Sequence, residues 1–90
     1  MTVDEFLQSE AELQVLLRAA GPVEFLRALL RKVRGEAEIL PEESLTLGEG
    51  QASTRFTFTD RAGRTLSFTI VSKRQPGVEL AYELVLREPA

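Results

Sequence analysis

The sequence predicts an α+β domain in which two N-terminal helices pack on one face of a four-stranded antiparallel β-meander (ααββββ). Three observations carry this prediction. Apolar residues recur at helical spacing in the first third of the chain, they alternate with polar residues in the second half, and turn residues separate the consecutive strands. Because every connection joins sequential neighbours, no crossover is required. A chain of 90 residues is expected to form one domain with a single core.

The first helix is expected over residues 3–20. The segment Thr2–Glu5 has the spacing of a capping box, which satisfies two backbone N–H groups at a helix start. Ser9–Glu12 repeats the spacing, so two alternatives stay open: one continuous helix, or a helix that restarts at Glu10. The apolar stripe of this segment consists of Phe6, Leu13, Leu16, Leu17 and Ala20.

The second helix is expected over residues 22–34. Gly21 suits a helix end and Pro22 suits the first position of a new helix, because that position needs no N–H donor. Gly35 is the expected stop. The predicted buried stripe consists of Val23, Leu26, Leu29, Leu30 and Val33, with Phe25 on its flank.

Residues 35–43 are expected to form an acidic connector that is broken by Pro41, and residues 44–48 a short edge strand. Gly48–Gly50 would then turn the chain into the next strand. The carboxylates of the connector lack the alternating oxygen ligands and the central glycine of a calcium-binding loop, so no metal site is predicted there. These carboxylates belong to Glu36, Glu38, Glu42 and Glu43.

A central hairpin is expected from strands 51–59 and 65–73. Between them, Asp60 suits the first position of a type I turn and Gly63 suits the positive φ of a G1 bulge. A last strand is expected over 78–87, where apolar and polar residues alternate most regularly. The inner face of the sheet is predicted to hold Leu45, Leu47, Phe56, Phe58, Leu66, Phe68, Ile70, Val78, Leu80, Tyr82, Leu84 and Leu86.

The composition argues against an enzyme. The chain contains neither cysteine nor histidine, which removes thiolate chemistry and the side chain used most often for proton transfer near neutral pH. The one feature that favours catalysis is the surroundings of the only two lysines, Lys32 and Lys73, because neighbouring basic residues are expected to lower the pKa of an ammonium group and so make it a better base. No glycine-rich segment has the spacing and following helix of a phosphate-binding loop. We therefore predict no catalytic residue, no cofactor and no bound metal.

The outer face of the sheet predicts a protein-interaction module. Most of its side chains are hydroxylated, which is typical of a solvated strand surface, but a few aliphatic residues form an apolar centre within this polar surround. We expect self-association, as a homodimer, through this face or through an exposed edge strand. The residues expected in the interface are Thr57, Thr69, Val71, Ala81 and Val85.

Two alternative functions stay open. The first is binding of nucleic acid or another polyanion through arginines of the central hairpin and the second helix. The net charge of −3 and the absence of an aromatic residue on the outer face disfavour nucleic acid. Cations near a helix C-terminus also have a simpler explanation in the helix dipole, which we favour. The second alternative is a small apolar ligand between helices and sheet. The candidate anion-binding residues are Arg27, Arg31, Arg34, Arg55, Arg61 and Arg64.

The sequence predicts a cytoplasmic protein that has no membrane-spanning segment and no membrane as a partner. No apolar run approaches the length that crosses a bilayer, and the N-terminal residues Asp4 and Glu5 are acidic where a secretion signal would be basic.

Overall fold

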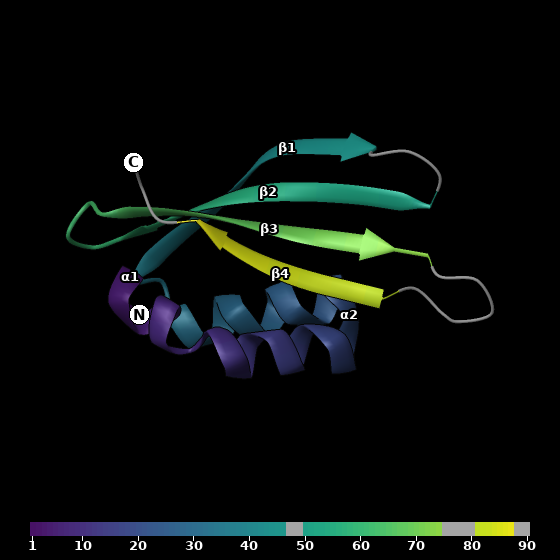
Figure 1. Cartoon of the computed structure of the whole chain (residues 1–90). Coiled ribbons are helices and arrows are strands. Elements are labelled where there is room, and N and C mark those ends of the chain that lie inside the picture. The colour runs from purple at the N-terminus through teal and green to yellow at the C-terminus, as the bar shows by residue number, and fades with distance from the viewer. Residues whose placement is uncertain (47–49, 75–80, 88–90) are drawn as a thin grey trace.

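The computed structural model describes residues 1–46, 50–74 and 81–87. A layer of helices covers one face of a four-stranded antiparallel sheet, and the opposite face of the sheet has no helix over it (Figure 1). The predicted α+β class with an antiparallel sheet is confirmed. The elements are α1 (Val3–Gln8), α2 (Glu10–Val33), β1 (Ala37–Thr46), β2 (Gln51–Asp60), β3 (Thr65–Lys73) and β4 (Ala81–Arg87), and the strand order is β1-β2-β3-β4.

The predicted capping box starts α1. The Thr2 hydroxyl accepts a hydrogen bond from the Glu5 amide (3.1 Å), and the Glu5 carboxylate accepts one from the Thr2 amide (3.0 Å). The prediction of one continuous helix over residues 3–20 is wrong. The first helix ends at Gln8 and a second begins at Glu10, as the other alternative proposed. Ser9 lies at the break and donates its hydroxyl hydrogen back to the Glu5 carbonyl (2.8 Å).

Gly21 divides α2 into two helical halves. Its φ of 83° and ψ of 168° are non-helical, and glycine adopts a positive φ without steric cost. The chain reverses direction there, so both halves lie on the same face of the sheet (Figure 1). The second half ends at Val33 rather than residue 34, because Arg34 has left-handed backbone angles (φ 51°, ψ 37°).

The buried side of the second helical half differs from the predicted stripe. Phe25 is fully buried, whereas Val23 and Leu30 are 62% and 53% exposed. The helix is therefore rotated so that Phe25, Leu29 and Val33 face the sheet. Phenylalanine offers more apolar area for burial than valine, so turning Phe25 inwards removes more apolar surface from water.

The central hairpin has the predicted turn. The Gly63 amide donates to the Asp60 carbonyl and the Asp60 amide donates to the Arg64 carbonyl, both at 3.0 Å, and Gly63 has a φ of 82°. These features are those of a type I turn closed by a G1 bulge. The hairpin pairs Phe58 with Leu66 and Phe56 with Phe68 across the two strands.

Aromatic side chains join the helices to the inner face of the sheet. The Phe6 ring lies 4.9 Å from the Phe58 ring and 5.2 Å from the Phe68 ring, measured between centroids, and Phe56 stacks on Phe68 at 5.2 Å. Of the predicted inner face, Phe56, Phe58, Leu66, Phe68, Ile70 and Leu84 are buried, and Tyr82 and Leu86 are half-buried. Leu47, Val78 and Leu80 lie outside the described residues.

The prediction of an acidic connector over residues 35–43 is wrong, because residues 37–43 belong to β1. This strand pairs with β2 from Ala37 to Thr46, with a β-bulge between Pro41 and Glu43. β1 is the first strand in the sheet, so only one side of it pairs, and proline is tolerated in such an edge strand and at bulges. The proline that suggested a connector instead lies beside the bulge of a longer strand.

Hydrogen bonds to the Asp60 carboxylate link the start of α1 to the hairpin turn. This carboxylate is only 7% exposed and accepts hydrogen bonds from the amides of Val3, Ala62 and Arg64, each at 3.0 Å. The bond from Val3 is the main reason that the pKa of Asp60 lies below its ordinary value. The other two amides and the nearby Arg64 charge lower this pKa further, and burial opposes them. Folding therefore favours the ionised carboxylate.

Candidate interaction surface on the outer sheet face

The strand register brings two rows of side chains together on the outer face. In the first row, Glu43 lies opposite Arg55, Arg55 opposite Thr69 and Thr69 opposite Val85, so the row crosses all four strands. The second row runs in the same way. It consists of Leu45, Ser53, Val71 and Glu83. Residues from four separate segments of the chain thereby form one continuous surface.

Leu45 reaches this surface because of the β-bulge in β1. Before the bulge, Ile39 pairs with the inward-facing Phe58; after it, Leu45 pairs with Ser53, whose side chain is on the outer face. A bulge adds one residue to a strand, and one residue is enough to exchange the faces of every side chain beyond it. The prediction that Leu45 lies on the inner face is therefore wrong, and its side chain is 48% exposed.

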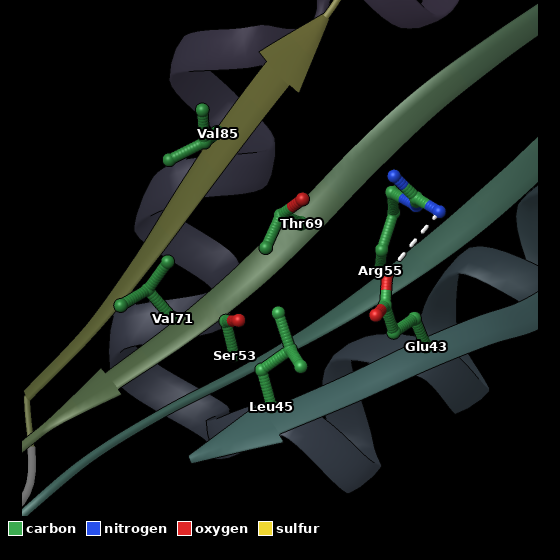
Figure 2. A pocket seen from close by; sticks show the side chains of 7 residues that line it. All are labelled: Glu43, Leu45, Ser53, Arg55, Thr69, Val71 and Val85. Atoms are coloured by element: carbon green, nitrogen blue, oxygen red, sulfur yellow. Dashed lines mark ion pairs between the residues drawn. The ribbon is translucent and has the colours of Figure 1, made fainter. Parts of the chain in front are cut away.

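The two rows enclose a shallow hollow of about 320 Å³. Figure 2 shows the side chains around it, all on the side of the sheet away from the helices. We call this surface the outer patch. Its residues are Glu43, Leu45, Ser53, Arg55, Thr69, Val71 and Val85. Leu45, Val71 and Val85 supply aliphatic groups, and the remaining members are polar.

Three of the five predicted interface residues belong to the outer patch, namely Thr69, Val71 and Val85. Thr57 lies on the same face, opposite Leu40 of β1. Ala81 lies opposite Lys73 at the end of β4. Sequence reasoning missed Leu40 and Leu45, which are 49% and 48% exposed. A proline inside an alternating segment is the signal that could have indicated a bulge and therefore a change of face.

The charged side chains beside the aliphatic groups are paired within the chain. Arg55 and Glu43 approach to 3.4 Å (Figure 2), and Lys73 and Glu83 approach to 3.6 Å. All four side chains are about half exposed, so each pair adds little to stability. The pairs do cancel the charge, and this region of the outer face carries no net charge.

Both edge strands of the sheet, β1 and β4, have features that oppose the addition of another strand. On β4, the Gln14 side chain of α2 accepts a hydrogen bond from the Leu84 amide (2.8 Å) and donates one to the Tyr82 carbonyl (3.4 Å). On β1, Pro41 and the adjacent bulge interrupt the edge. Backbone groups that are already bonded, proline and bulges are the usual devices that protect sheet edges.

The predicted anion-binding arginines lie in separate places. Three of them are in ion pairs, since Arg27 pairs with Glu24 (2.9 Å), Arg55 with Glu43 and Arg64 with Asp4 (2.9 Å). Arg31 and Arg34 line an open hollow at the C-terminal end of α2, which also contains Glu5 and Glu36. Arg61 is exposed in the turn of the hairpin.

Neither a metal-binding cluster nor a membrane-spanning helix is present in the described part of the chain. Within residues 1–46, 50–74 and 81–87, no three acidic residues gather in a way that could hold a metal ion. Over the same residues, no helix has the length and apolar character needed to cross a membrane.

Comparison with known proteins adds no functional information: no protein-family model, no curated protein and no solved structure matches the chain. Functional inference therefore rests on the geometry of the outer face and on the charge of the helices.

Proposed function

We propose that the chain is a non-enzymatic interaction module that forms a homodimer by packing the outer sheet faces of two copies together. The observation that carries the proposal is the outer patch, which exposes aliphatic groups from β1, β3 and β4 around one hollow on the face of the sheet away from the helices. The proposal keeps the cytoplasmic location expected from the sequence.

The exposure of Leu40 and Leu45 supports the proposal that another molecule covers the outer face. Both leucines leave about half of their surface in water, although the inner face of the same sheet buries Phe58, Leu66 and Phe68 completely. Covering apolar surface is favourable by about 25 cal/mol per Å². A second copy of this face would cover both leucines together with Val71 and Val85.

Charge supports a second copy as the partner. In a two-fold symmetric dimer each face meets itself, so a face with net charge would repel its own copy. The ion pairs Glu43–Arg55 and Lys73–Glu83 leave no net charge around the outer patch. A strongly charged partner would find no complement there, whereas an identical face meets no repulsion.

The size of the face is also suitable. The four strands contain 10, 10, 9 and 7 residues. With a spacing of about 4.8 Å between strands and a rise of about 3.3 Å per residue, they cover a projected area of roughly 570 Å². The accessible area of a face with side chains exceeds this flat projection. It therefore approaches the roughly 800 Å² per partner of a standard interface.

An edge strand gives a less suitable route to self-association. Gln14 already bonds to the backbone of β4, and Pro41 and the bulge interrupt β1, so a second chain could not extend the sheet without breaking these contacts or avoiding the bulge. The face is therefore the part of the sheet that we propose as the interface.

The two alternatives from the sequence have less support. A polyanion would compete with acidic partners for Arg27, Arg55 and Arg64, and Arg31 and Arg34 of the helical layer lie apart from Arg55 on the outer face. An apolar ligand between helices and sheet would have to displace aromatic rings, because Phe6 contacts Phe58 and Phe68 there.

Sedimentation of matched variants tests the proposed dimer. We expect wild-type protein to dimerise between about 10 μM and 1 mM, a range typical of weak complexes. Leu45→Asp should weaken the dimer at least a hundredfold, because an unpaired charge in an interface costs about 3–5 kcal/mol. Val23→Asp is the matched control: it makes the same change at an exposed aliphatic residue on the helices, and it should leave the dimer unchanged.

Two results would contradict the proposal. Wild-type protein that stays monomeric up to about 1 mM would exclude a homodimer of useful affinity. A dimer that survives Leu45→Asp would place the interface elsewhere. Leu45 is already half exposed in the monomer, so its replacement should not unfold the chain, and far-UV circular dichroism checks this point.

A further inference from the structure

The helices carry exposed aliphatic residues on the side that faces away from the sheet. Val15, Val23 and Leu30 of α2 are 66%, 62% and 53% exposed. An α-helix turns by about 100° per residue, so Val15 lies roughly 200° around the helix from the buried Leu13, and Val23 lies equally far from the buried Phe25. These three side chains cannot join the core without rotating the helices.

Arginines flank the exposed aliphatic residues of the second helical half. Arg27 and Arg31 are one turn apart on the same face of α2, Arg34 follows as the C-cap residue with left-handed backbone angles, and all three are exposed. Arg27 also pairs with Glu24 at 2.9 Å, so part of its charge is offset within the helix. We call this surface the basic helix face. It consists of Val23, Arg27, Leu30, Arg31 and Arg34. Residues 18–34 contain five basic residues and one acidic residue, Glu24, so this segment carries a charge of +4 in a chain whose net charge is −3.

We propose that the basic helix face binds the surface of an anionic phospholipid bilayer. Arginines provide attraction to anionic headgroups, and Val23 and Leu30 provide apolar groups that can enter the boundary with the acyl chains. The prediction of no membrane partner rested on the lack of a long apolar run and on the acidic N-terminal residues, and a helix that lies in the plane of the interface needs neither a long apolar run nor a basic signal.

A second copy of the chain is a poor partner for the basic helix face. Under two-fold symmetry, the strip of Arg27, Arg31 and Arg34 would meet an identical cationic strip. Nucleic acid would satisfy the arginines but would leave Val23 and Leu30 without apolar contacts. The helical half from residue 22 to residue 33 is only about 18 Å long, which is too short by itself for a standard protein interface.

This surface is separate from the proposed dimer interface. The helices and the outer patch lie on opposite sides of the sheet (Figure 1), so one chain can use both at once. The two proposals can therefore fail independently: a monomeric protein could still bind vesicles, and a dimer could fail to do so. In a dimer formed through the outer faces, the two basic helix faces would point in opposite directions.

Co-sedimentation of the full chain with lipid vesicles tests the proposal. At about 50 mM salt, we expect binding to phosphatidylcholine vesicles that contain about 30% phosphatidylserine, weaker binding at about 300 mM salt, and no binding to pure phosphatidylcholine. The double variant Arg27→Gln/Arg31→Gln should bind at least tenfold more weakly, because each cation near an anionic surface contributes about fivefold. Leu30→Ser should reduce binding several-fold at constant charge.

Arg61→Gln is the matched control, since it removes an exposed arginine from the hairpin turn rather than from the helices, and it should bind as wild type does. The proposal is overturned if wild-type protein does not bind phosphatidylserine vesicles at about 50 mM salt. It is also overturned if Arg61→Gln weakens binding as much as the double variant, which would indicate attraction by total charge. Unchanged binding of Leu30→Ser would indicate a purely ionic contact and would equally contradict insertion of the helix face.

Discussion

The two faces of the sheet are built from the same four strands but have opposite relations to solvent. On the inner face, Phe58, Leu66 and Phe68 are completely buried under α1 and α2. On the outer face, Val71 and Val85 are only half-buried, and Leu45 leaves 48% of its surface exposed. The inner face thus stabilises the chain through apolar burial, whereas the outer face leaves apolar surface available for contact with another molecule.

The difference between the faces follows from side-chain chemistry at alternate positions. On β2 and β3 the inward positions are mainly phenylalanine, leucine and isoleucine, and the outward positions are mainly threonine and serine. Threonine suits a strand that keeps one face in water. The aliphatic residues of the outer patch come largely from β1 and β4, which flank the hydroxyl-rich centre. On β2 and β3 the distribution of residue types therefore separates the core face from the contact face, whereas on β1 the bulge brings Leu45 to the contact face.

Truncation on the two faces should have very different effects on stability, and this contrast is the largest effect that we predict. Phe58→Ala removes a fully buried ring that contacts Phe6, so it should lower the free energy of unfolding by about 3–5 kcal/mol. Val71→Ala on the outer face should cost about 1 kcal/mol or less in the monomer, since Val71 is already half in water. Urea denaturation at low protein concentration measures both, and equal losses would contradict the assignment of the faces.

The sequence was sufficient to predict the parts of the fold where local signals agree. The alternation over residues 51–59 and 65–73, together with Asp60 and Gly63, correctly predicted the central hairpin and its turn. The capping box at Thr2 was also predictable. In each of these segments the periodicity, the turn residues and the expected burial indicate the same structure, so no long-range information is needed.

The rest depended on contacts between distant parts of the chain. Nothing local predicts that Phe25 rather than Leu30 turns inwards, because that choice depends on the fit of the helix against the sheet. In the same way, the bulge after Pro41 depends on pairing with β2. Of the candidate site, the residues of β3 and β4 were predictable from alternation, whereas Leu45 was not, because one extra residue moved it to the other face.

Replacement of Asp60 tests how α1 is held against the inner face of the sheet. The Asp60 carboxylate joins the start of α1 to the hairpin, so Asp60→Asn should destabilise the chain by less than Phe58→Ala, since the core packing stays intact. The pKa of Asp60 is lowered by folding, mainly through the Val3 amide. Its contribution is therefore fully present above the ordinary carboxyl pKa of about 3.9 and is lost as the pH falls through the lowered value.

Unfolding measured between neutral pH and the acid range checks this prediction. Wild-type protein should lose stability on acidification, and Asp60→Asn should flatten that loss. Asp4→Asn is the control, because Asp4 is an exposed carboxylate that forms an ion pair with Arg64. If the pH dependence of Asp60→Asn matched that of wild type, the linkage between α1 and the hairpin would have to involve another group.

The smallest effect that we predict concerns the edge of the sheet, where the inner and outer faces meet. Gln14→Ala removes one hydrogen bond from the Leu84 amide and one to the Tyr82 carbonyl, which is one fewer backbone partner than Asp60 holds. Leaving partly buried backbone groups unpaired costs about 1–3 kcal/mol, and we expect a loss near the lower end because water can reach the edge. The Leu84 amide should exchange its hydrogen faster in this variant. The exchange rates of the β2 amides should change only as far as the global stability of the chain changes. Gln8→Ala, an exposed glutamine on α1, is the matched control. If the variant also aggregates where wild type does not, Gln14 protects the edge and self-association of the native chain is directed to the outer face.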